Sequence, residues 1–98
     1  MRISQFEKES IIKNAKYIFG NEATVTLFGS RADMKKKGGD IDIFIDTRDK
    51  NELTVKNKLF FLVALKNDIG EQKIDVILNT PYSKNINKTA IKTGLRLC

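Results

Sequence analysis

Histidine and tryptophan are absent from this 98-residue sequence, and cysteine and proline occur only once each. Without histidine, neither a Ser-His-Asp triad nor a histidine-ligated metal site can form. The single cysteine, Cys98, has no partner for an internal disulfide. A reducing compartment is therefore the expected environment.

Long hydrophobic runs are also missing. The longest, Leu59 to Leu65, has seven residues, whereas a membrane-spanning helix needs roughly 20. The N-terminal region carries Glu7, Lys8 and Glu9 where a signal peptide would need an apolar stretch. We therefore expect a soluble, cytoplasmic protein.

The composition is that of an ordinary globular protein, with 41% hydrophobic and 31% charged residues. These values argue against disorder, and the length predicts a single domain over residues 1–98. The net charge of +6 suits an anionic partner or substrate. It does not distinguish nucleic acid, a nucleoside triphosphate and an acidic protein surface.

Periodicity and terminal signals predict a helix that begins at Ser4, as part of a capping box with Glu7, and ends at Gly20. A second helix is predicted over 51–69, closed by Gly70, and a third from Ser83 to about Thr93. Alternating or apolar β-branched runs predict strands at 24–28, 40–46 and 73–78, with a short edge strand at 95–97. The order α-β-β-α-β-α indicates an α/β (α+β) domain with a small mixed sheet and helices packed against it.

The connections predict how these strands pair. A loop of about ten residues between the first two strands allows antiparallel pairing, and the helical crossover to the third strand favours a parallel, right-handed connection. The end of the first strand then meets the starts of the other two. This places Gly29-Ser30, Asp40, Asp42 and Asp75 at one edge of the sheet.

These residue types suit metal-dependent phosphate chemistry. Asp40 and Asp42 are two apart on a strand and share a face, so both carboxylates can reach metal ions roughly 3.5–4 Å apart. With Asp75 they form an all-oxygen set that suits Mg²⁺ or Mn²⁺. Gly29 allows close approach to a phosphate, and Ser30 and Arg31 can bind phosphate oxygens.

Each of these signals alone has an ordinary explanation. A Gly-Ser pair after a strand is usually a turn, an Asp-x-Asp on a strand is usually a solvated face, and the lysine run 35–37 suits a solvated loop tip that steers anions. The joint pattern, in one order and at three strand boundaries, favours a site. That site indicates nucleotidyl transfer.

The segment Gly29-Ser30-Arg31, followed by Asp40-Ile41-Asp42 and by Asp75 in an apolar strand, resembles the DNA polymerase β-like nucleotidyltransferase superfamily. Over residues 3–97 the chain is similar to its minimal nucleotidyltransferases (MNT). The resemblance implies that Asp40, Asp42 and Asp75 bind two Mg²⁺ ions and that the Gly-Ser pair binds the triphosphate of ATP or another NTP. It also points to the MntA-like antitoxins of HEPN/MNT pairs, some of which transfer AMP to a tyrosine of an all-helical HEPN-type toxin.

We therefore expect a Mg²⁺-dependent nucleotidyltransferase that moves AMP from ATP to a hydroxyl acceptor, with the acceptor brought by a HEPN-type partner or by a second copy of the chain. Two alternatives belong to other classes. One is a non-catalytic antitoxin that neutralises a toxin by contact alone. The other is a basic nucleic-acid-binding domain, although the sequence has no cluster of aromatic residues for base stacking.

Overall fold

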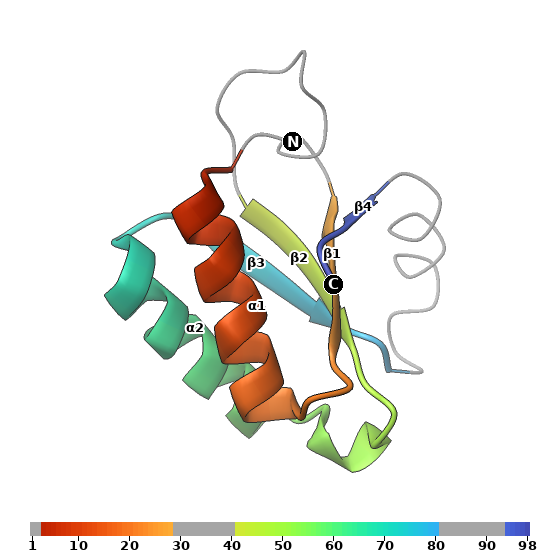
Figure 1. Ribbon diagram of the computed structural model, residues 1–98. Coiled ribbons are helices and arrows are strands. Elements are labelled where there is room, and N and C mark those ends of the chain that lie inside the picture. Colours follow the sequence, from red (N-terminus) through yellow and green to blue (C-terminus); the bar gives the residue numbers. More distant parts are fainter. Residues whose placement is uncertain (1–2, 29–40, 81–93) are drawn as a thin grey trace.

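The structure is a computed structural model that describes residues 3–28, 41–80 and 94–98 (Figure 1). In chain order its elements are α1 (Gln5–Phe19), β1 (Thr24–Phe28), β2 (Ile41–Asp46), the short 3₁₀ helix η2 (Lys50–Glu52), α2 (Val55–Ile69), β3 (Ile74–Leu78) and β4 (Leu95–Arg96). This small α+β arrangement agrees with the predicted fold class. The helix predicted over 83–93 lies outside the described residues.

Helix α1 begins and ends where its sequence signals predict. The Ser4 hydroxyl accepts a hydrogen bond from the Glu7 amide at 3.0 Å, and the Glu7 carboxylate accepts one from the Ser4 amide at 2.8 Å. This reciprocal pair is the predicted capping box. The helix ends at Gly20, whose φ of 109° lies in a region that glycine tolerates best.

Helix α2 starts later than the sequence analysis predicted. Residues from 51 were expected to be helical, but Lys50–Glu52 forms the separate turn η2, in which the Asp49 carboxylate accepts a hydrogen bond from the Asn51 amide. The α-helix proper begins after Thr54, whose hydroxyl accepts from the Asn57 amide at 3.1 Å. Asp49 and Thr54 each cap the start of a separate helix. The hydrophobic periodicity does not show this division, so it predicted one longer helix.

The sheet is mixed, with the strand order β3-β2-β1-β4. β1 and β2 pair antiparallel from Thr24↔Asp46 to Phe28↔Asp42, and β2 and β3 pair parallel. Both pairings confirm the predicted topology. β4 pairs antiparallel with β1 and has two residues, one fewer than the 95–97 predicted.

The two long helices lie together on one face of the sheet (Figure 1). Alternate strand residues point into the helix layer, so the core lies between sheet and helices. There the rings of Phe19 and Phe61 lie 6.0 Å apart between centroids. The strand residues that are buried in this core are Val25, Leu27, Ile41, Ile43, Ile45, Ile74, Val76 and Leu78.

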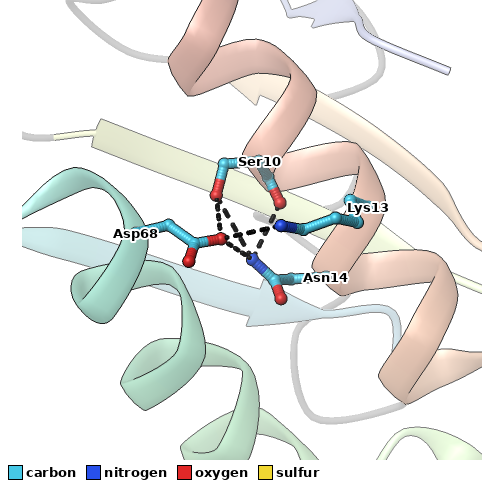
Figure 2. A network of polar contacts seen from close by, with 4 residues as sticks. All are labelled: Ser10, Lys13, Asn14 and Asp68. Carbon is cyan, nitrogen blue, oxygen red and sulfur yellow. Dashed lines mark hydrogen bonds and ion pairs between the residues drawn. The ribbon is translucent and has the colours of Figure 1, made fainter.

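A polar network fixes the two helices against each other (Figure 2). The Asp68 carboxylate of α2 accepts hydrogen bonds from the Ser10 hydroxyl at 2.7 Å and the Asn14 amide at 3.1 Å, and it forms an ion pair with Lys13 at 3.3 Å. Ser10 and Asn14 are buried on α1. These contacts satisfy polar groups in the helix interface, and they hold the pKa of Asp68 below its usual value.

None of the described helices is both long and apolar enough to span a lipid bilayer.

Candidate active site

Asp42 and Asp75 lie side by side at the starts of two parallel strands. Asp42 of β2 and Asp75 of β3 are Cα partners in the register, and adjacent strands are about 4.8 Å apart. Each follows a buried isoleucine, Ile41 or Ile74, that points into the helix layer. Since successive side chains alternate between faces, both carboxylates lie on the face opposite the helices.

The two aspartates also have surroundings that suit a ligand. Asp42 is half-buried and Asp75 is exposed. Within the part of the chain that the structure describes, the Asp75 side chain has no hydrogen bond and no ion pair. Like charges directly opposite each other on neighbouring strands destabilise a sheet. A cation bound by both carboxylates would offset this repulsion.

The end of β1 lies next to this pair. Phe28, the last residue of β1, is the register partner of Asp42, so the chain leaves β1 at the edge of the sheet where the aspartates lie. The predicted phosphate-binding residues Gly29, Ser30 and Arg31 follow directly in sequence. These three residues, the third predicted carboxylate and the lysines at 35–37 lie outside the described residues.

Carboxylate oxygens are ligands that Mg²⁺ and Mn²⁺ favour. The donor chemistry of Asp42 and Asp75, on one face and in register, fits such an ion. Among the residues at 3–28, 41–80 and 94–98, no group of three potential metal-ligating side chains occurs. The predicted set needs Asp40, which precedes Ile41 in the sequence and falls outside these ranges. The structure thus brings two of the three predicted ligands together and leaves the third undescribed.

Asp46 shows by contrast what a structural carboxylate looks like on the same strand. It forms an ion pair with Lys50 and accepts a hydrogen bond from the Thr47 amide at 2.8 Å. Burial of the Asp46 carboxylate acts to raise its pKa, but hydrogen bonds from Lys50, Asn79 and Thr47 outweigh burial and hold the pKa below its usual value. The hydrogen-bond partners of Asp46 therefore come from the protein, and they stabilise the polar connection between β2 and η2.

A shallow pocket of about 210 Å³ lies across β2, β1 and β4. Its lining residues are Thr24, Thr26, Phe44, Asp46, Gly94 and Arg96. Asp42, Phe44 and Asp46 lie at alternate positions of β2, so the pocket lies on the face that carries the aspartates, and Phe44 is itself buried on that face. Sequence reasoning did not single out Arg96, although its place between two leucines of a predicted strand was an available signal.

Comparison of the sequence with known proteins identifies the family to which the chain belongs. A family model described as Polymerase beta, Nucleotidyltransferase matches residues 9–98. No curated protein and no solved structure matches the chain. The matched region is almost the whole chain, and it contains both Asp42 and Asp75 together with the predicted phosphate-binding segment. The chain therefore belongs to the polymerase β family of nucleotidyltransferases.

Proposed function

We propose that this protein is a Mg²⁺-dependent enzyme that transfers AMP from ATP to a hydroxyl group of a partner protein in the cytoplasm. The observation that supports this most directly is the in-register pair Asp42 and Asp75. The pair lies beside the end of β1, and Gly29 and Ser30 follow this strand in the sequence. The chain also belongs to a family of nucleotidyltransferases.

The residues have distinct roles in this proposal. Asp42 and Asp75, with Asp40, would hold Mg²⁺ or Mn²⁺, which when bound neutralises phosphate charge and makes a hydroxyl easier to deprotonate. Gly29 and Ser30, with Arg31, would hold the triphosphate. In the transfer, a bond forms between the acceptor oxygen and the α-phosphorus, the bond from this phosphorus to the bridging oxygen breaks, and pyrophosphate leaves. In this proposal Asp75 would also help to accept the proton of the acceptor hydroxyl.

A protein acceptor is favoured by the resemblance of the chain to minimal nucleotidyltransferases. The resemblance to MntA-like antitoxins makes a tyrosine of a HEPN-type toxin the most specific candidate, so the chain would act as an antitoxin.

The test is transfer of label from α-labelled ATP, with Mg²⁺, to a purified HEPN-type protein encoded beside this chain. Wild type is expected to label the partner. Asp42→Asn is expected to reduce labelling by roughly a hundredfold or more, because the variant weakens electrostatic stabilisation of the reacting phosphate. A matched control is Asp49→Asn, which alters the cap of η2, beyond the opposite end of β2.

Two results would count against this function. If neither wild type nor Asp42→Asn transfers label, yet both protect cells from the toxin equally, the contact-only antitoxin is the better account. If wild type instead binds nucleic acid, and this binding falls steeply with salt as phosphate contacts require, the net charge of +6 serves nucleic-acid binding rather than catalysis.

A further inference from the structure

Helix α2 carries large apolar side chains on its outer side as well as on its inner side. Val55, Leu59 and Val63 are 71%, 56% and 61% exposed, and Phe60 is 54% exposed. The inner side is formed by Phe61 and Leu65, both fully buried. The core therefore does not account for the outer residues.

The outer residues form one continuous surface. Val55, Leu59 and Val63 are spaced four apart, so they follow one another along a single side of the helix. At 100° per residue, Phe60 lies beside this row, and the row points roughly away from Phe61 and Leu65. A contiguous exposed apolar surface on a small domain commonly marks an interaction site.

The charges on this side of α2 have one sign. Lys56 and Lys66 share the side of the helix with the apolar row, and the Lys56 ammonium lies 5.8 Å from the centroid of the Phe60 ring. The only carboxylate in α2 belongs to Asp68, which is engaged by Ser10 and Asn14 of α1. The outer side of α2 therefore combines an apolar row with positive charge and has no acidic side chain of its own.

We propose that this α2 outer surface, made of Val55, Lys56, Leu59, Phe60, Val63 and Lys66, binds an amphipathic helix of a partner protein whose apolar row is flanked by acidic residues. An apolar row on the outer side of a helix can pack against the apolar row of a second helix, as in a coiled-coil pair, and the lysines select acidic flanks. The proposal concerns binding alone and holds whether or not the chain transfers nucleotides.

Charge also decides against a second copy of the chain as the occupant. Two copies that meet through α2 would bring Lys56 and Lys66 of one against lysines of the other, and like charges brought together across an interface oppose association. Each copy also carries a net charge of +6. An acidic partner gains from the same charges that would separate two copies.

The test measures binding of a fluorescein-labelled synthetic peptide by fluorescence anisotropy, with the full chain as the receptor. The peptide is an amphipathic helix with a leucine row flanked by glutamates, and its comparison peptide has lysines in place of the glutamates. Wild type is expected to bind the glutamate peptide at least about tenfold more tightly than the lysine peptide, because only the glutamates complement the lysines of α2.

Three variants locate the binding surface. Leu59→Ser with Val63→Ser is expected to weaken binding of the glutamate peptide by about tenfold or more, since it removes the centre of the apolar row. Lys56→Glu with Lys66→Glu is expected to reverse the preference between the two peptides. Tyr17→Ser removes an exposed aromatic side chain of α1 (89% exposed) outside this surface, and it should bind as wild type does.

Several results would overturn the proposal. These are no binding of the glutamate peptide by wild type, equal binding by the Leu59/Val63 variant, or equal binding of both peptides. A wild-type dimer in sedimentation that the Leu59/Val63 variant loses would identify a second copy as the occupant instead. Binding to phosphatidylglycerol-containing vesicles that the same variant loses, without peptide binding, would identify a membrane. Matching circular dichroism of wild type and variants shows that a loss of binding is not a loss of folding.

Discussion

Asp46 and Asp68 are carboxylates whose hydrogen-bond partners come from the protein itself. Lys50, Asn79 and Thr47 surround Asp46, and residues of α1 surround Asp68. Asp75 has no such side-chain contact within the described residues. Because an ionised carboxylate needs positive charge, donors or water around it, these surroundings separate two structural acids from one that is available to a ligand.

The lowered pKa of Asp68 predicts a pH-dependent stability. Hydrogen bonds from Ser10 and Asn14, then the contact with Lys13, favour the charged form and hold the pKa below the usual 3.8. The stabilisation is therefore complete above that value and is lost as the pH falls through the lower pKa of the folded state. Urea unfolding of wild type and Asp68→Asn, from about pH 6 to about pH 2.5, should show a wild-type advantage that disappears at the acidic end.

If the stability difference between wild type and Asp68→Asn stays constant with pH, the charge of Asp68 does not contribute to the stability of the folded state. Glu71→Gln, which removes an exposed acid close to the end of α2, is the matched control and should follow the wild-type profile.

At the scale of elements, α2 is a helix with two apolar sides, and adjacent residues have opposite environments. Phe61 is fully buried against Phe19, whereas Phe60 is 54% exposed. Adjacent residues of a helix lie about 100° apart, so the two rings cannot both point into the core, and Phe61 is the one that does. The choice follows from the α1 interface, since the side of α2 that carries Asp68 and Leu65 faces α1 and the sheet.

Truncation of these two phenylalanines should have very different effects on the free energy of unfolding. Phe61→Ala leaves a cavity in the core and is expected to cost about 3–5 kcal/mol, a large share of the stability of a small domain. Phe60→Ala should change stability by less than about 0.5 kcal/mol, as exposed substitutions usually do. Chemical denaturation of the two variants measures both values. Similar costs for the two variants would contradict an orientation of α2 in which Phe61 is buried and Phe60 is exposed.

At the scale of the whole molecule, the fold separates stability from chemistry. Both long helices cover one face of the sheet (Figure 1) and bury the apolar strand residues. Asp42 and Asp75 lie on the other face at one edge, where a charged ligand can approach without disturbing the core. The apolar outer side of α2 belongs to the helix layer, so a partner bound there would leave the face with the aspartates open.

This arrangement predicts that one site residue opposes stability in the absence of metal. Asp75→Asn removes a like-charge neighbour of Asp42 and should stabilise the metal-free protein by up to about 1 kcal/mol, which is about 4–8 °C in Tm for a domain near this size. In the presence of Mg²⁺ and ATP, wild type should gain Tm through binding to the folded state, and the variant should gain little. Thermal unfolding with and without the ligands measures both effects.

The control Asp49→Asn should respond to Mg²⁺ and ATP as wild type does. A Tm that Mg²⁺ and ATP leave unchanged in wild type would argue against the metal site. Loss of metal-free stability in Asp75→Asn would argue against repulsion between the two acids.

Much of this fold could be predicted because its signals are local. Ser4 and Glu7 set the start of α1 through hydrogen bonds between neighbours, Thr24–Phe28 is the strand that was predicted, and loop length with crossover handedness determined how the strands pair. The same topology predicted that Asp42 and Asp75 would share an edge. Their one-to-one register confirms this shared position at the edge of the sheet, while their role as metal ligands stays a prediction.

By itself, then, the sequence determined most of the described elements, the pairing of the strands and the meeting of Asp42 with Asp75, since these follow from short-range patterns and chain connectivity. The tertiary structure decided which of Phe60 and Phe61 enters the core, that Asp68 would bind α1, and that Arg96 would line a pocket across β1. Those outcomes depend on contacts between residues far apart in the chain. The structure determines them only when the helices pack against the sheet, because this packing decides which side of each element is buried.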